Sequence, residues 1–354
     1  MPLGFVRFYD KSLKATHLAI NLERPMTAAQ RPFTPTLQMP SGRLGFAGHE
    51  TFPLRYGWLK KAVDAVREDP HLLSSDRALV SLGVGKNMVQ SIRHWGLATQ
   101  VLREGPGRSL EVSPIGALLL EQWDPYLEDP ASLWLVHWHL VNNPARAAVW
   151  HLAFTYLTSP DFTKRQLISF LLEVKERNEL RVRESSLSRD VDCFIRSYLA
   201  LEGSKNSLPE DSFDCPLAEL GLLSPLRDGE GYRFTIGPKP TLPAEVVGYA
   251  LLEYMGRVRQ GRNSIAFSDC LYGVGSPGQV FKLDENSLVE YLEALEEIGD
   301  GALELDDTAG LKQLYRRREL EPVSLLHRYY GDDPHAAPWR GADSLALVHR
   351  GGRA

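Results

Sequence analysis

The stretch LGVGKNMVQSIRHWGLA, residues 82–98, opens with a tight glycine turn and continues as a helix. Its apolar residues recur at helical spacing and predict one inward-facing side for a helix over 86–98. They are Met88, Val89, Ile92 and Trp95. A second helix is expected just before the glycines, over 75–82, and two helices joined by a short glycine turn form the helix-turn-helix plan.

The segments on either side extend this pair into a small domain. Upstream, apolar residues from Phe52 to Val66 recur at spacings of four and three, which predicts an amphipathic helix from Thr51 with Pro53 in its first turn. Downstream, TQVLREGPGRSLEVSP (99–114) places two short strands around a Gly-Pro-Gly turn, a hairpin by its turn chemistry. Helix, turn, helix and hairpin together predict a winged helix over residues 44–121.

The rest of the chain is expected to form further domains, because 354 residues with 43% hydrophobic content exceed the size of one core. We predict a mainly α (α+β), multi-domain helical protein with winged-helix units that carry short β-hairpins. Residues 1–43 are proline-rich and predict a flexible N-terminal tail. Residues 122–201 predict a helical middle domain, and residues 202–354 a C-terminal domain with winged-helix-like units and an acidic helix.

The C-terminal domain is expected to repeat the order of helices, turns and strands of the first domain. CPLAELGLLSPLRDGEGYRFTIG (215–237) reads as short helix, glycine turn, strand, turn and strand, which predicts a second small winged unit. LDENSLVEYLEALEEIG (283–299) predicts a helix, and GALELDDTAGLKQLYRR (301–317) predicts a third hairpin. Residues 283–307 hold ten acidic side chains and no Lys or Arg. This surface should repel DNA unless a metal or a basic partner covers it.

Composition excludes several classes of protein. Three cysteines without paired spacing give no zinc site or disulfide framework, which favours the reducing cytoplasm. No run approaches the roughly 18 apolar residues of a membrane span. GVGK at 83–86 lacks the spacing of a P-loop, so no nucleotide or organic cofactor is expected. The histidines of 137–151 fit an aromatic helical core. A net charge of -5 confines any nucleic-acid surface to a local patch.

The helix at 86–98 carries the best candidate for such a patch. Its polar residues Lys86, Asn87, Gln90, Arg93 and His94 are expected on one face, opposite the apolar stripe. Asn, Gln and Arg contact base edges and Lys contacts phosphate, so this face predicts binding to duplex DNA. Further DNA-binding candidates nearby are Arg55, Lys60 and Arg108. A face used for protein contacts is the alternative, because folds are often reused.

Two other segments contain residues suited to catalysis. In GHETFPLRYGWLKKA (48–62), His49 and Glu50 are expected just before a helix and suit proton transfer or metal binding, although ordinary capping by Glu50 is the alternative. In SRDVDCFIRSYL (188–199), Asp190 and Asp192 do not share a helix face, and Asp190 can instead turn inward to pair with a basic residue. The basic run KERNELRVRESS (175–186) lies just upstream.

Five blocks in order resemble the SspB family of bacterial DNA phosphorothioation systems. They are FAGHETFPLRYGWLKKA (46–62), LGVGKNMVQSIRHWGLA (82–98), SPIGALLL (113–120), SLSRDVDCFIRSY (186–198) and GSPGQVFKLDE (275–285). The resemblance covers residues 45 to about 330. It implies a cytoplasmic bacterial protein that nicks one DNA strand so that sulfur can replace a backbone oxygen, in a defence system against phage. It also implies a cysteine desulfurase and other Ssp-type modification proteins as partners.

Nicking by hydrolysis sets chemical requirements that limit the candidate residues. It needs an activated water, charge relief on the phosphate and usually one or two divalent ions held by carboxylates. The catalytic candidates are His49 as base and Glu50, Asp190 and Asp192 as acids, with Glu50 and Asp190 as ligands of Mg²⁺ or Mn²⁺. The alternative is a non-enzymatic winged-helix adaptor or regulator that recruits the sulfur-transfer enzymes. Whether the chain forms a homodimer stays open.

Overall fold

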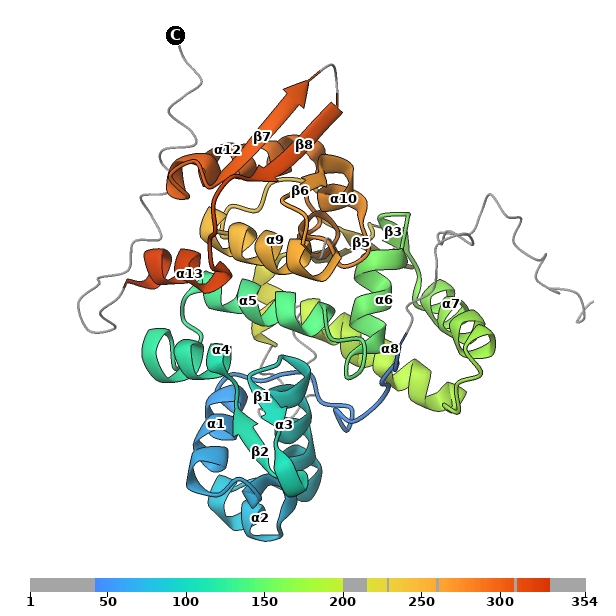
Figure 1. Cartoon of the computed structure of the whole chain (residues 1–354). Coiled ribbons are helices and arrows are strands. Elements are labelled where there is room, and N and C mark those ends of the chain that lie inside the picture. Colours follow the sequence, from blue (N-terminus) through green and yellow to red (C-terminus); the bar gives the residue numbers. More distant parts are fainter. Residues whose placement is uncertain (1–41, 200–214, 228, 259–260, 309–310, 332–354) are drawn as a thin grey trace, which may run out of the picture. The chain divides into compact units, whose positions relative to one another are not determined.

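The computed structural model describes residues 42–199, 215–227, 229–258, 261–308 and 311–331 of the chain (Figure 1). They all lie within one compact unit, residues 32–354. The predicted N-terminal tail lies outside the described residues except for its last two. No described helix has both the length and the apolar character needed to cross a bilayer.

The first unit has the element order that the sequence predicts. It consists of α1 (Trp58–Glu68), a 3-10 turn (Leu72–Ser74), α2 (Arg77–Leu82), α3 (Lys86–Ala98), β1 (Leu102–Glu104), the turn Pro106–Arg108 and β2 (Leu110–Val112). The strands pair antiparallel, with Leu102 opposite Val112. The apolar face of α1 packs against α3 and β2. The elements therefore follow the order helix, turn, helix and hairpin.

The predicted start of the first helix at Thr51 is wrong. The helix begins at Trp58, and residues 52–55 before it are irregular. Glu50 and Thr51 have φ angles of 46° and 69°, in the left-handed region that no residue of a right-handed helix adopts. The GHET segment is therefore a loop, and Glu50 caps no helix.

A buried helix connects the first unit to the remaining elements. After α4 (Pro114–Ala117) and a π-helical turn (Leu118–Trp123), α5 (Pro130–Val141) begins with Asp129 capping the Ala131 amide. All its residues from Ala131 onward are buried, which fits a helix that is apolar all round. It contacts α6 (Ala148–Tyr156), α9 (Ala244–Val258) and α11 (Pro277–Phe281).

The second unit draws its elements from both sides of residue 202. It consists of α6, β3 (Asp161–Phe162), α7 (Lys164–Arg177), α8 (Glu184–Tyr198), a 3-10 turn (Pro216–Leu220), β4 (Leu223–Pro225) and β5 (Tyr232–Phe234). The predicted hairpin is confirmed in β4 and β5, but β3 also pairs antiparallel with β5. The predicted boundary between 201 and 202 therefore falls inside one three-stranded sheet.

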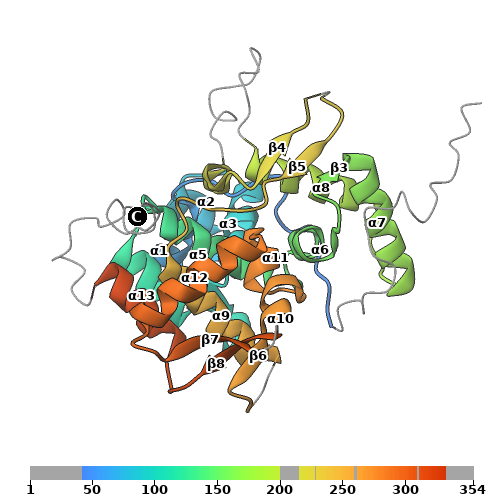
Figure 2. The same cartoon turned by 90° about the horizontal axis from the view of Figure 1, so that it is seen from above.

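The third unit has a similar order of elements, with one more α-helix between its first strand and its hairpin. It consists of α9, β6 (Ser264–Ala266), α10 (Phe267–Tyr272), α11, α12 (Glu285–Ile298), β7 (Leu303–Thr308) and β8 (Leu311–Arg316), and α13 (Pro322–Tyr330) follows and packs on α9. The sheet order β6-β8-β7 matches β3-β5-β4 of the second unit. Both the predicted acidic helix and the predicted third hairpin are confirmed, and they lie beside each other (Figure 2).

Candidate functional site

Residues 45–52, here named the GHET loop, run between α3 and α8. Within this loop Ala47, Gly48, Glu50 and Thr51 all have positive φ, from 46° to 94°. Three of these four are not glycine, so the conformation is strained and persists only if surrounding contacts hold it. One end is fixed by the backbone: Gly45 donates to the carbonyl of Pro144 and accepts from the amide of Ala148.

A buried pair of side chains holds the middle of the loop. The Nε2 atom of His49 lies 3.0 Å from Oδ1 of Asp190 on α8, and the Ala47 amide donates to Oδ2 of Asp190 at 2.8 Å. The Thr51 amide donates to Nδ1 of His49 at 3.1 Å. Because Nδ1 accepts this bond, the ring proton lies on Nε2 and is donated to Asp190. Both residues are only 2% exposed.

This geometry gives His49 and Asp190 a positioning role. Both ring nitrogens of His49 and both carboxylate oxygens of Asp190 are engaged within the protein. The expected alternative, that Asp190 turns inward to meet a basic residue, is what the structure shows. Asp192 lies on another face of α8, is partly exposed, and its carboxylate pairs with Lys164 at 2.5 Å.

Contacts from α3 and α8 fix the rest of the loop. The Ser91 hydroxyl donates to the His49 carbonyl at 2.7 Å, and Arg196 donates to the Thr51 carbonyl at 2.5 Å. The indole of Trp95 donates to the Phe52 carbonyl at 3.1 Å. Ser91 and Arg196 were not identified as site residues from the sequence, because only the folded loop brings them to it.

Glu50 differs from the other acidic candidates. Its side chain is partly exposed, and it makes no hydrogen bond or ion pair with any described residue. It therefore offers a free carboxylate on a loop whose backbone is fixed on both sides. A carboxylate held in this way suits an incoming cation or a proton donor.

Glu50 and Asp190, the predicted metal ligands, do not form a metal site together. In the described part of the chain, no group of three or more His, Cys, Asp and Glu side chains is placed to hold an ion. Asp190 is buried with both oxygens bonded, which leaves Glu50 as the available member of the pair. Mg²⁺ commonly keeps several waters and takes one or two carboxylates together with substrate phosphates. An ion at Glu50 would need phosphate and water as its other ligands.

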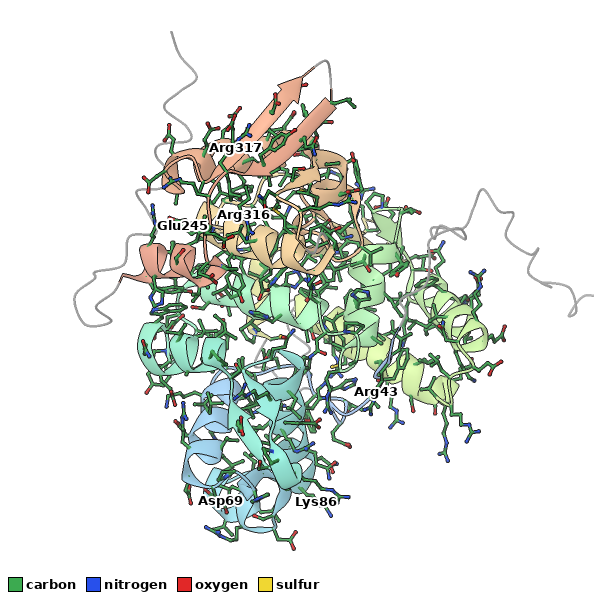
Figure 3. All side chains as sticks on the ribbon, viewed as in Figure 1. Arg43, Asp69, Lys86, Glu245, Arg316 and Arg317 are labelled. Carbon is green, nitrogen blue, oxygen red and sulfur yellow. The ribbon has the colours of Figure 1, made fainter. Side chains whose placement is uncertain are left out.

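Most of the predicted DNA-binding face of α3 is exposed. Lys86, Asn87 and Gln90 are exposed and Arg93 is partly buried. Lys86 lies at the N-terminal end of the helix (Figure 3) and has no ion-pair partner among the described residues. The first two helical turns therefore present one cation and two amides to solvent.

His94 does not belong to this exposed face, contrary to the prediction. It is 9% exposed and contacts the ring of His49, with centroids 5.9 Å apart. Burial, with smaller contributions from His49 and two arginines, lowers the pKa of His94 to about 3. The GHET loop covers the side of α3 where His94 lies, which helical spacing alone does not indicate.

The three remaining basic candidates differ in their contacts with neighbouring side chains. Lys60 pairs with Asp64 one turn later on α1, at 2.5 Å. The Arg55 guanidinium lies over the rings of Phe52 and Trp58, 5.4 Å from each centroid. Arg108 is exposed in the β1–β2 turn and has no ion-pair partner in the described chain. Lys86 and Arg108 are thus the predicted cations most available to a phosphate.

Comparison with known proteins gives a family and two similar structures. The family described as a protein of unknown function (DUF4007) matches residues 46–330. A crystal structure of SspB and a magnesium ion-bound crystal structure of SspB each have 30% sequence identity to this chain and a TM-score of 0.75. Each match covers 86% of this chain and 95% of the SspB chain. No curated protein sequence matches.

Proposed function

Because this chain belongs to the DUF4007 family and its fold is that of SspB, we propose that it binds duplex DNA and nicks one strand to support phosphorothioate modification. The observation that carries the proposal is the GHET loop, fixed between α3 and α8 with Glu50 free. The loop lies against the helix that exposes Lys86, Asn87 and Gln90. In this proposal the Glu50 carboxylate acts on DNA that α3 binds.

The catalytic candidates of the loop and of α8 have different parts in the proposed reaction. Glu50 orients the attacking water or holds a cation against the phosphate, because its carboxylate is free. His49 and Asp190 keep the loop in its strained conformation, and Asp192 remains a further acidic candidate at the surface of α8. A bound Mg²⁺ or Mn²⁺ would supply charge relief on the phosphate. The magnesium ion-bound SspB structure supports the choice of ion.

DNA binding is assigned to α3 and the hairpin that follows it. Asn87 and Gln90 have the amide groups that read base edges in the major groove, while Lys86 and Arg108 suit phosphates. Arg93, Arg55 and Lys60 are secondary candidates, because they are partly buried or already engaged with neighbouring side chains. The likeness to SspB also supports two further proposals: the protein is cytoplasmic, and it acts with a cysteine desulfurase and other Ssp-type proteins. Homodimer formation is a separate proposal, to be measured by light scattering.

Conversion of supercoiled plasmid to open circles tests the proposal. The purified protein is assayed with Mg²⁺, Mn²⁺ or EDTA. We expect open circles with either metal, none with EDTA, and a loss of at least about 100-fold in rate for Glu50→Gln. Glu293→Gln, at an exposed carboxylate on the acidic helix α12, is the matched control and should nick normally.

Two results would change the assignment. Normal nicking by Glu50→Gln would remove Glu50 from the site, and nicking in EDTA would remove the ion. Clear DNA binding by the wild type without open circles in any metal would favour the non-enzymatic adaptor, which uses the same α3 surface without cutting.

A further inference from the structure

By the order of elements along the chain, α8 of the second unit corresponds to α3 of the first unit. In both units this helix is the last described α-helix before the hairpin: α3 precedes β1 and β2, and α8 precedes β4 and β5, with the 3-10 turn Pro216–Leu220 between α8 and β4. The third unit has α12 in the same place. The three units thus offer three candidate helices for DNA contact, and their charges differ.

The turn between α7 and α8 is basic and exposed. Over residues 176–189 the exposed charged side chains are four arginines and three glutamates, an excess of one positive charge: Arg177, Arg181, Arg183, Arg189, Glu176, Glu179 and Glu184. Arg181 and Arg183 form no ion pair with any described residue. Figures 1 and 2 show α7 at the outer edge of the second unit. These two arginines are therefore available to an anionic partner.

The equivalent region of the third unit has the opposite character. Helix α12 holds five glutamates and no Lys or Arg. The cations of the adjoining hairpin are already engaged, since Lys312 pairs with Glu285 and Arg317 pairs with Glu304. Figure 3 shows Arg316 and Arg317 on this hairpin. Phosphate would be repelled there, so charge selects the second unit over the third.

The residue types on α8 indicate which part of DNA it contacts. Its first turns, Glu184–Arg189, contain Ser and Arg but no Asn or Gln. Arg and Ser hydroxyls are common phosphate contacts, whereas Asn and Gln amides read adenine edges. Phosphate contacts fix the position of a protein on the duplex without selecting sequence. Only α3 of these two helices exposes the amides needed for base reading.

The GHET loop fixes α8 to the first unit. Asp190 of α8 bonds the His49 ring and the Ala47 amide, and Arg196 of α8 bonds the Thr51 carbonyl. Ser91 of α3 holds the same loop from the other side. A duplex held by both helices would therefore be held by one rigid framework, with Glu50 on the connecting loop.

We propose that the α7–α8 turn is a second DNA-contacting surface, which grips the phosphate backbone through Arg181 and Arg183 while α3 contacts the bases. This inference rests on the proposed function, because it assumes that the chain binds DNA.

Salt-dependent binding to a 30-base-pair duplex tests the second surface. Affinity of the full chain is measured by fluorescence anisotropy from 50 to 200 mM NaCl. We expect Arg181→Ala/Arg183→Ala to weaken binding by about 10- to 30-fold at 150 mM salt and to lower the slope of log K against log salt by about 2. Arg181→Lys/Arg183→Lys keeps both charges and should restore most of the slope.

The control changes the same net charge elsewhere. Arg262→Glu alters an exposed arginine of the third unit by two charge units and should leave the slope unchanged. Lys86→Ala reports on the first surface. An unchanged slope for Arg181→Ala/Arg183→Ala, alongside weakened binding for Lys86→Ala, overturns the second surface and leaves the proposed function standing. Absence of DNA binding by the wild type overturns both, and points the α7–α8 turn toward an acidic protein partner.

Discussion

Gly48 has φ of 94°, and its Cα faces the imidazole of His94. A Cβ at this position would lie 2.6 Å from Nδ1 of His94, closer than any normal contact. Glycine is therefore required at position 48 for two reasons: the backbone is left-handed, and the His94 ring leaves no room for a Cβ atom. Both requirements come from the fold of the GHET loop.

We predict that Gly48→Ala destabilises the protein more than Gly57→Ala. Gly57 also has positive φ, at 75°, but has open space around its Cα, so alanine there costs only the backbone term of about 1–2 kcal/mol. At Gly48 the collision with His94 adds about 1–3 kcal/mol. Urea unfolding followed by tryptophan fluorescence measures both. Equal losses would mean that His94 moves aside freely.

For single residues, the sequence predicted the helix face on which a side chain lies better than it predicted which residues contact each other. It indicated that Asp190 and Asp192 lie on different faces of a helix and that Asp190 can turn inward. It did not identify His49 as the partner of Asp190, because the two residues are 141 positions apart. Nor did it show that His94 is buried, since helical spacing does not reveal which loop covers a helix.

Two lysines connect several elements in the interior. Lys282 follows α11 in a left-handed conformation and donates to the Phe154 carbonyl of α6 at 2.6 Å. Lys239, from the loop before α9, donates to three carbonyls: Thr235, Gly237 and Lys282. Desolvation lowers the pKa of Lys282 to about 7 and that of Lys239 to about 8. These elements are therefore joined by amines that titrate near neutral pH.

The buried amine makes stability depend on pH in a defined direction. Between about pH 7 and 10 the unfolded chain keeps the Lys282 proton while the folded chain releases it, so the free energy of unfolding should rise with pH. Below pH 7 both states carry the proton and this contribution is lost. We predict that the difference in stability between wild type and Lys282→Met shifts by about 1–2 kcal/mol in favour of wild type from pH 6.5 to 8.5.

Urea unfolding at several pH values provides the measurement, and Lys86→Met is the control because Lys86 is exposed. Its difference from wild type should stay constant across the same range. A constant difference for Lys282→Met as well would show that Lys282 keeps its ordinary pKa in the fold.

Elements with strong local signals were predicted and weak ones were missed. All three hairpins were found, because glycine-rich turns fix their positions. Strand β3 was not found, because its two residues are too short for any alternation of apolar and polar side chains. The start of α1 was placed too early, because apolar spacing continues through residues 52–56 although their backbone is not helical.

At the scale of the whole molecule, the described chain forms three units that each contain an antiparallel hairpin, and the buried helix α5 packs against elements of the second and third units. The sequence predicted the fold class and the first unit, and it indicated winged-like hairpins in the other two. It assigned α7 and α8 to a separate middle domain, because the pairing of β3 with β5 and the packing of α8 on Pro216–Leu220 join segments on both sides of residue 202. Pairing between distant segments decides domain membership, and local patterns carry no information about it.

The pairing of β3 with β5 has a practical consequence for how the protein can be assembled. Asp161 and Arg233 form a two-point ion pair across these strands at 2.6 Å, and Phe162 and Phe234 pack with ring centroids 5.2 Å apart. Helix α8 also packs on the 3-10 turn Pro216–Leu220. Two co-expressed polypeptides, one ending near residue 205 and the other starting there, should therefore find each other and co-purify through a tag on one half. Asp161→Arg should weaken this reconstitution, and Asp161→Arg/Arg233→Asp should recover it. Assembly of the protein from two polypeptides would then depend on a strand pair of two residues.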